Sequence, residues 1–282
     1  MTTATAVPID VRRVAANGIT LNVATAGTGP PVLLLHGWPH TWQLWSAVLP
    51  RLAAHHRVIA PDLRGLGGSV RAAGYDAQTL AADAGGLLDS LGETSAAVVA
   101  IDAGVPTAFM LAMTAPHRVH RLVVMESLLG TLPGAERFLA GGPPWWFGFH
   151  AVSGLAETVL PGHEGAYLDW FLTAGTHQGR GIDPVVRDAF VDAYTGTEAL
   201  RVGFEYYRAG PTNSQQISAA VTHRRLTMPT MAVGAHPVGD SLYRQLLPVT
   251  DDLIGHLLDD CGHLIPLDRP DALLDLLIPF IT

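Results

Sequence analysis

The sequence contains no lysine, and its 17 basic residues are all arginines. They are outnumbered by 25 aspartates and glutamates, so the formal net charge is -8 at pH 7. The arginines form no basic run, whereas a nucleic-acid-binding surface needs clustered positive charge to contact phosphates. We therefore expect no nucleic-acid partner.

Cysteine is almost as scarce, since Cys261 is the single residue of this type. One cysteine excludes a disulfide within the chain. The N-terminal residues MTTATAVPID lack the basic segment and apolar core of a secretory signal. No stretch approaches the roughly 18 uninterrupted apolar residues that a membrane span requires. We therefore expect a cytoplasmic protein with no membrane partner.

Short apolar runs alternate with segments of helical periodicity along much of the 282 residues. The first two expected strands flank the Asn17-Gly18 dipeptide, which favours a hairpin turn. Further strands are expected at residues 31–37, 57–65, 96–102, 121–126, 229–235 and 255–260. This alternation predicts an α/β fold, in which a mostly parallel, twisted sheet carries helices on both faces.

The alternation stops between residues 131 and 223. This segment has no strand-like apolar run, and it contains Gly-Pro punctuation, many aromatic residues and helical patterns such as GAYLDWFL. We expect residues 1–130 and 224–282 to form the α/β core and residues 131–223 to form an inserted helical cap. The sequence leaves the oligomeric state open, including a homodimer.

The stretch VVAIDAGVP places one carboxylate, that of Asp102, where an expected strand turns into a helix. Ala100 and Gly104 stand two positions before and after it, which is the pattern of a nucleophile elbow. Such a turn strains the backbone of the apex residue and lifts its side chain above the sheet edge. An aspartate in this position can attack an sp3 carbon and form an ester. The competing interpretation is that Asp102 caps the following helix.

Three further polar residues follow expected strands. Glu126 ends RLVVME, Asp240 comes a few residues after PTMAVGA, and His263 lies just past the last strand. Open α/β sheets bind ligands beyond the carboxyl ends of their strands, so we expect a nucleophile, an acid and a base there. No cofactor or metal is expected, because GLGGS lacks dinucleotide-binding spacing and the histidines do not form a metal-binding motif.

With these motifs the chain resembles the epoxide hydrolase group of the α/β-hydrolases, which also includes haloalkane and fluoroacetate dehalogenases. The resemblance extends from about residue 17 to the C-terminus and includes the elbow. The other matching stretches are HGWPHTWQLW, DLRGLGGS, RLVVMES, FEYYRAG and CGHLIP. The group usually has Gly-His before the elbow aspartate, whereas this chain has Ala100-Ile101 and so keeps a small residue at the flank.

The resemblance implies a cofactor-free hydrolase that converts a small-molecule epoxide and water into a vicinal diol. Asp102 would form a covalent ester with the substrate, and His263 would activate the water that hydrolyses it. Glu126 and Asp240 are rival acids for orienting His263. We favour Glu126 because it lies directly at a strand end.

The backbone N–H groups of Trp38 and Ala103 would form the oxyanion hole, and Trp38-Pro39 is a candidate cis peptide. In the expected cap, the resemblance points to Tyr207 rather than Tyr206 as the acid that protonates the epoxide oxygen. The two tyrosines are adjacent on a helix, so they cannot both face the site.

The position that usually carries a second donor, His or Tyr, aligns with Trp146. An indole can donate a hydrogen bond but cannot give up its proton. Trp145, Trp146 and Phe149 either line an apolar pocket or hold the cap in place.

The aromatic cap favours a bulky apolar substrate, such as a natural-product intermediate. The first alternative is a dehalogenase with the same nucleophile and base. Against it, haloalkane dehalogenases have Trp at the position of Ala103, and fluoroacetate dehalogenases have Arg at those of Ala103 and Pro106. The second alternative is a non-catalytic ligand-binding homologue, suggested by the loss of the elbow Gly-His and of the cap histidine.

Overall fold

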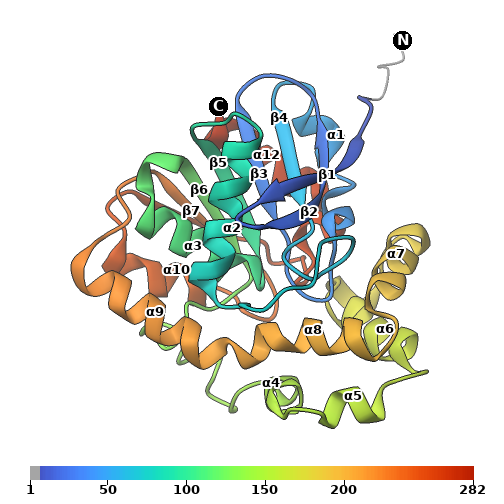
Figure 1. The fold of residues 1–282 in the computed structure, drawn as a ribbon. Helices are drawn as coiled ribbons and strands as arrows, with labels where there is room; N and C mark the ends of the chain where they lie inside the picture. Colours follow the sequence, from blue (N-terminus) through green and yellow to red (C-terminus); the bar gives the residue numbers. More distant parts are fainter. Residues whose placement is uncertain (1–6) are drawn as a thin grey trace.

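The computed structural model describes residues 7–282 and shows one sheet covered by helices on both faces (Figure 1). The strand order is β1-β2-β4-β3-β5-β6-β7-β8, with β2 antiparallel to β1 and β4 and the other pairs parallel. The expected mostly parallel α/β sheet is confirmed. The strands are β1 (Asp10–Ala16), β2 (Ile19–Ala26), β3 (Pro31–Leu35), β4 (Arg57–Pro61), β5 (Ala96–Ile101), β6 (Val119–Met125), β7 (Thr230–Gly234) and β8 (Leu253–Leu257).

The expected N-terminal hairpin is confirmed. Strands β1 and β2 pair from Asp10 opposite Thr25 to Ala16 opposite Ile19. The two residues between them, Asn17 and Gly18, have φ values of 48° and 77°. Positive φ at both central positions is the conformation that an Asn-Gly turn supplies at low steric cost.

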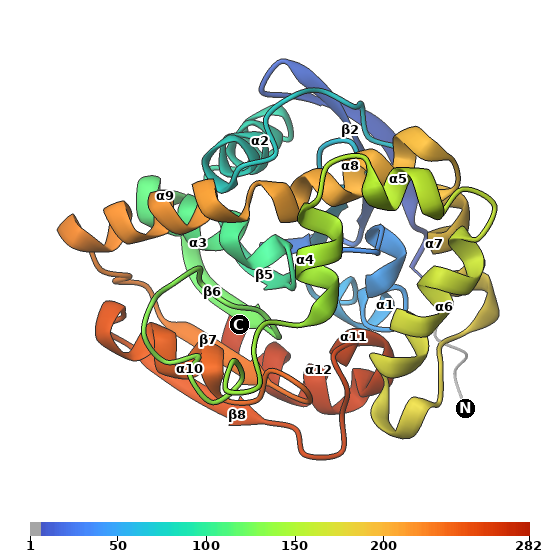
Figure 2. The same ribbon diagram turned by 90° about the horizontal axis from the view of Figure 1, so that it is seen from below.

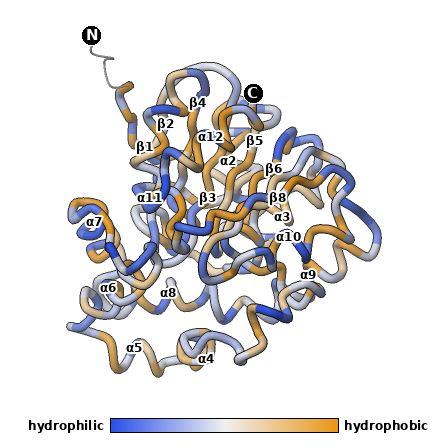
Figure 3. Tube along the Cα trace, turned by 180° about the vertical axis from the view of Figure 1, so that it is seen from behind, coloured by the Kyte–Doolittle hydropathy of each residue, from blue (hydrophilic) through white to orange (hydrophobic). Residues whose placement is uncertain are grey.

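The central strand β5 shows why the sheet is covered on both faces. All six of its residues are buried. Alternate side chains enter two different hydrophobic clusters, because successive residues of a strand point to opposite faces. Hydrophobic colouring accordingly follows the central strands (Figure 3).

The helices that cover the sheet lie before β6 and after β7 in the chain. One cluster is completed by residues of α2, α3 and α10, and the other by residues of α1, α11 and α12. These helices and the short 3-10 turns are η1 (Trp42–Trp45), α1 (Leu49–Leu52), α2 (Ala77–Ser90), α3 (Gly104–Thr114), η2 (Pro116–Arg118), α10 (Ser241–Leu246), η4 (Leu247–Val249), α11 (Ile265–Asp268) and α12 (Pro270–Ile281).

The last strand departs from the expected boundaries. It was expected at residues 255–260, whereas β8 comprises Leu253–Leu257. Four of its five residues are exposed, because β8 is the edge strand and pairs only with β7. An edge strand of this kind has no continuous apolar run to mark its limits.

Between β6 and β7 the described chain forms helices and no strand. We refer to α4–α9 as the insert. Seen from below, α4 and α8 cross the ends of the central strands (Figure 2). The insert comprises α4 (Trp145–Ala151), α5 (Leu155–Val159), α6 (Glu164–Ala174), η3 (His177–Gly179), α7 (Pro184–Tyr194), α8 (Thr197–Arg208) and α9 (Gly210–His223).

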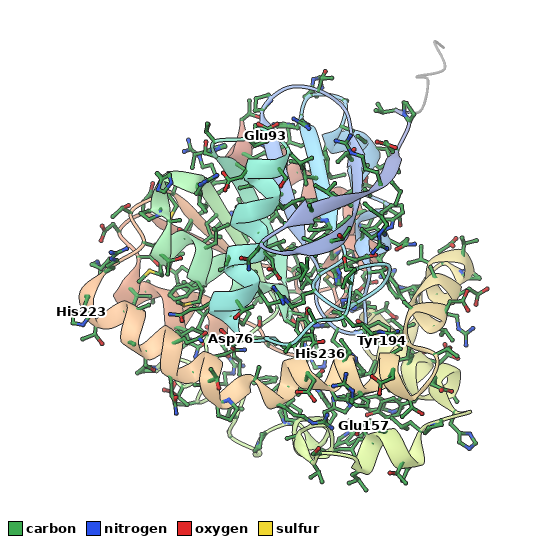
Figure 4. All side chains as sticks on the ribbon, viewed as in Figure 1. Asp76, Glu93, Glu157, Tyr194, His223 and His236 are labelled. Carbon is green, nitrogen blue, oxygen red and sulfur yellow. The ribbon has the colours of Figure 1, made fainter. Side chains whose placement is uncertain are left out.

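Hydrogen bonds from both helices of the α8–α9 pair attach the insert to the core. The Tyr206 hydroxyl of α8 donates to the Arg64 carbonyl oxygen at 2.8 Å. The Gln216 amide of α9 donates to Asp76 at 2.7 Å, and Asp76 in turn caps the start of α2 (Figure 4). These bonds fix the insert over the carboxyl ends of the strands, where the expected site lies.

Candidate active site

Asp102 occupies a strained turn between β5 and α3. Its φ is 52°, a left-handed conformation that costs a non-glycine residue about 1 kcal/mol or more. The turn is enclosed by two glycines. A Cβ at Gly104 would lie 2.5 Å from the His36 carbonyl oxygen, and a Cβ at Gly37 would lie 2.2 Å from the Asp102 carboxylate. Only hydrogen fits at either position, so the strained turn depends on both glycines.

The Asp102 carboxylate faces backbone N–H groups. The Trp38 N–H donates to Asp102 Oδ1 at 2.8 Å, and the backbone of Ala103 also hydrogen-bonds this carboxylate. The Trp38-Pro39 peptide is cis, which confirms that expectation. The Asp102 side chain remains 24% exposed, so a small molecule can still reach it.

His263 lies between two carboxylates. Its Nε2 is 3.3 Å from Asp102 Oδ2, and its Nδ1 is 3.3 Å from Glu126 Oε2. Glu126 directly follows β6, has a φ of 44° and is 1% exposed. Its carboxylate accepts the Ala235 N–H at 2.6 Å, from the turn that follows β7. The turns that follow four parallel strands thus meet at one edge of the sheet.

The structure brings Glu126, and not Asp240, to His263. Asp240 lies at the start of α10 and pairs with Arg244 at 2.7 Å, one helical turn along. Within residues 7–282, its carboxylate has no contact with His263 among the ion pairs and hydrogen bonds. Glu126 reaches the imidazole because it is the first residue after its strand, whereas Asp240 is separated from β7 by five residues.

The two carboxylates control the charge of His263. Burial opposes a positive charge, but hydrogen bonds and attraction to Asp102 and Glu126 outweigh it and raise the pKa of His263 to about 10. Burial likewise opposes the charge on Asp102. The hydrogen bond and the positive charge of His263 offset this and lower the pKa of Asp102 below its ordinary value. At neutral pH the pair is therefore aspartate and imidazolium.

Tyr206 and Tyr207 point in different directions from α8, as expected. The Tyr206 hydroxyl is directed away from Asp102, because it donates to the backbone carbonyl oxygen of Arg64 in the core. The Tyr207 ring instead packs edge-to-face on Trp38, with ring centroids 5.6 Å apart. Burial, and then the nearby charge of Asp102, raise the pKa of Tyr207 well above its ordinary value. Tyr207 thus faces the site as a protonated phenol.

The sequence reasoning missed His150. This fully buried residue of α4 packs edge-to-face on Tyr207, with centroids 4.3 Å apart, and on Trp38 at 4.7 Å. Its Nε2 lies 2.6 Å from the Tyr167 hydroxyl, and its Nδ1 has no hydrogen-bond partner in the described chain. Burial, and then the charge of Arg208, lower the pKa of His150 to about 3, so the ring is neutral.

The resemblance aligns Trp146 with the second donor position, whereas in the structure His150 is the residue that packs beside Tyr207. Within the part of the chain that the structure describes, Trp146 makes no ring contact with Tyr207. Its ring neighbours are Trp145, Phe147, Trp170 and Phe171. Residues 146 and 150 are one helical turn apart and share a face of α4, so helical periodicity alone could have offered His150 as a candidate.

The other two aromatic residues expected in the cap lie at different depths. Trp145 is 54% exposed and packs against Trp146 and Trp170. Phe149 is half-buried and contacts Tyr167 and His150. Trp145 therefore belongs to the outer packing of the insert, and Phe149 to the layer directly behind His150.

From residue 7 onward, no helix is both long enough and apolar enough to cross a membrane. In the same residues, no group of three or more His, Cys, Asp or Glu side chains is arranged to hold a metal ion.

Known proteins resemble this chain in sequence and in fold. A family model described as the alpha/beta hydrolase fold matches residues 30–160. The chain is 30% identical to a soluble epoxide hydrolase from Corynebacterium sp. (strain C12), over 94% of this chain and 95% of the relative. It is 27% identical to a fluoroacetate dehalogenase from Burkholderia sp., over 78% and 75%. Among solved structures, the epoxide hydrolase CorEH superposes with a TM-score of 0.87 at 28% identity, over 97% of this chain and 98% of the other.

Proposed function

Since this chain belongs to the α/β-hydrolases, in the family of the soluble epoxide hydrolases, we propose that it hydrolyses an epoxide to a vicinal diol through an ester on Asp102. The supporting observation is the row formed by Asp102, His263 and Glu126, with 3.3 Å between neighbours. A carboxylate alone could cap a helix. A carboxylate on a strained elbow, beside an imidazole that a second buried carboxylate orients, has the geometry of a nucleophile and its base.

In the first half-reaction, Asp102 attacks a ring carbon of the epoxide. The new bond joins a carboxylate oxygen to that carbon, and the carbon–oxygen bond of the ring breaks. The oxygen released takes the proton of the Tyr207 hydroxyl, because an unprotonated alkoxide would be too basic a leaving group.

His150 is the second donor to this oxygen. His150 Nε2 lies 2.6 Å from the Tyr167 hydroxyl, and Nδ1 has no protein partner in the described chain. We assign the tautomer in which Tyr167 donates to Nε2 and the neutral ring carries its proton on Nδ1, where it can donate to the epoxide oxygen. The insert forms the cap that carries both donors.

In the second half-reaction, water hydrolyses the ester. Esterification removes the negative charge of Asp102, which lowers the pKa of His263 and lets it return a proton to Tyr207. The neutral imidazole then accepts a proton from water as the water oxygen bonds to Cγ of Asp102. The N–H groups of Trp38 and Ala103 stabilise the oxyanion. The ester carbon–oxygen bond then breaks, the departing oxygen takes the proton of the added hydroxyl, and the diol leaves with the aspartate–imidazolium pair restored.

The substrate is an uncharged, apolar epoxide, because the donors of the insert stand among aromatic rings. A bulky natural-product intermediate meets this description. Cys261 is buried, and its pKa is raised to about 12, chiefly by burial, so this thiol is unreactive and takes no part in the proposed reaction.

Dehalogenation by the same Asp102 is the second candidate, supported by the fluoroacetate dehalogenase relative. A haloacid carries a carboxylate that needs a cationic partner. Within the described chain, however, Asp102 forms its ion pair with His263, and no arginine pairs with it. Release of fluoride from fluoroacetate tests this candidate, and we expect none.

Trapping the ester tests the proposed function. Rapid quenching with styrene oxide as the probe should yield protein whose mass is increased by one substrate. Repeated turnover in 18O-labelled water should then place the label in the Asp102 carboxylate. Diol formation without label in Asp102 would show that water attacks the epoxide directly. A wild-type protein that binds epoxides without turnover would instead support the non-catalytic alternative.

A further inference from the structure

A second buried histidine lies beside the candidate base. His40 follows the Trp38-Pro39 peptide and is completely buried. Its ring packs on Phe190 of α7, with centroids 5.4 Å apart, and lies 6.5 Å from the ring of His263. The Tyr194 hydroxyl, from the end of α7, donates to the His40 backbone carbonyl at 3.1 Å and fixes this loop (Figure 4).

Both ring nitrogens of His40 lack a hydrogen-bond partner in residues 7–282. A neutral imidazole has one N–H donor and one lone-pair acceptor, and leaving either unsatisfied in the interior destabilises the folded protein. Buried polar groups without a protein partner usually bind ordered water. His40 therefore has the donor and acceptor of a water site.

The surroundings of His40 indicate where this water lies. The charges of Asp102 and His263 both reach His40, and the two imidazole rings differ in tilt by 31°. A centroid separation of 6.5 Å is too long for a usual direct hydrogen bond and suits one bridging water molecule. Burial lowers the pKa of His40 to about 3, so the ring stays neutral and does not compete with His263 for a proton.

We propose that His40 is a water-positioning residue, which together with His263 holds the water that hydrolyses the Asp102 ester. This inference rests on the proposed function and assigns a role to a residue that the mechanism above does not use. The water donates one O–H to His263 Nε2 and the other to the unprotonated nitrogen of His40. A lone pair of its oxygen then faces Cγ of Asp102. As the new oxygen–carbon bond forms, the first proton passes to His263. When the tetrahedral intermediate collapses, the carbon–oxygen bond of the ester breaks, the proton left on the added oxygen passes to the departing oxygen, and the diol and the Asp102 carboxylate are released.

His40→Leu tests the proposal, with His56→Leu as the matched control. His56 is also buried and has an unpartnered Nδ1, but it precedes β4 at the opposite end of the sheet. With styrene oxide as the probe, quenched-flow mass spectrometry measures ester formation and ester breakdown separately. We expect His40→Leu to slow breakdown about tenfold or more while changing formation little. The ester then accumulates, and kcat and KM fall together.

The control and two conservative variants distinguish this role from packing. His56→Leu should leave both rates unchanged. His40→Asn and His40→Gln each keep an amide donor and acceptor, so at least one should restore much of the breakdown rate. Equal loss of both rates in His40→Leu, or no loss in either, would overturn the proposal. A wild-type enzyme that forms diol without any ester would instead overturn the proposed function, which the same measurement detects first.

A crystal structure of the wild-type protein provides a test that does not depend on the folding of a variant. We expect an ordered water within hydrogen-bond distance of a ring nitrogen of His40 and of His263 Nε2. Two imidazoles with no water density between them would contradict the proposal, even if His40→Leu reduced activity.

Discussion

The candidate site joins two regions that hold their side chains in different ways. The core presents Asp102 and Glu126 on tight turns at strand ends, where backbone N–H groups bind their carboxylates. The insert presents Tyr207 and His150 from helices, where aromatic contacts hold the rings. Backbone contacts persist when side chains change, whereas ring packing depends on each neighbouring side chain. We therefore expect the geometry of the core half to tolerate changes in neighbouring side chains better than that of the insert half.

If the core and the insert have different roles, substitutions in each should affect different half-reactions. The core should control the ester, and the insert should control the opening of the ring.

Asp102→Asn should have the largest effect. Asparagine tolerates a positive φ nearly as well as aspartate, so the elbow keeps its shape while the nucleophile is lost. We expect diol formation to fall by about 10⁴-fold or more, with no ester detected. Product analysis by chromatography measures the rate, and thermal denaturation checks the fold. If the variant kept a tenth of the activity, Asp102 could not be the nucleophile.

Glu126→Gln should have the next largest effect and spare the first half-reaction. Glutamine can still accept the Ala235 N–H but carries no charge to stabilise the imidazolium of His263. We expect ester breakdown to slow by about 10²-fold, so the ester accumulates on quenching. Asp240→Asn is the control, because Asp240 pairs with Arg244 on the surface. If Asp240→Asn were the damaging change, the assignment of Glu126 would be wrong.

Tyr207→Phe should slow ester formation by about 10²-fold and leave ester breakdown unchanged, because only ring opening needs its proton. Tyr206→Phe removes the neighbouring buried hydroxyl, which bonds to Arg64 instead. It should lower the free energy of unfolding by about 1 kcal/mol and leave both rates nearly intact. Stopped-flow kinetics and urea denaturation distinguish the two. Equal kinetic defects in the two variants would contradict the catalytic role of Tyr207 and the purely structural role of Tyr206.

The smallest effect concerns stability against pH. The pKa of His263 is raised from 6.5 to about 10 in the folded protein, so its protonation stabilises the fold fully below pH 6.5. This contribution disappears as the pH rises from 6.5 through about 10. We expect the melting temperature of the wild type relative to His263→Gln to decline over that range. A difference that grows with pH would show that the two carboxylates do not hold the imidazolium.

The core half of the site could be predicted from the sequence because its signals are local. A strand, a turn that requires small neighbours and a helix identify Asp102, and the first residue after an apolar strand identifies Glu126. The Asn17-Gly18 hairpin is local in the same sense. In each case the physical constraint acts on a few consecutive residues.

The insert half could not be predicted in the same way. Residues 146 and 150 lie on one face of α4, and only tertiary packing decides which of them meets Tyr207. The proximity of His40 to His263 joins positions more than 200 residues apart, and no local pattern marks it. The boundaries of the edge strand β8 were predicted wrongly for a related reason, since its exposed residues show no apolar periodicity.

The attachment of the insert has a practical consequence for engineering. Its hydroxyl bonds to the core end on backbone carbonyl oxygens, as Tyr206 does on Arg64 and Tyr194 on His40. Every residue type offers that acceptor. A chimaera that transplants residues 145–223 from a relative therefore needs matching tyrosines in the donor segment, whereas the side-chain pairs Gln216–Asp76 and Arg180–Asp268 must be matched in both donor and recipient. New substrate ranges are accessible by exchanging one continuous stretch of gene.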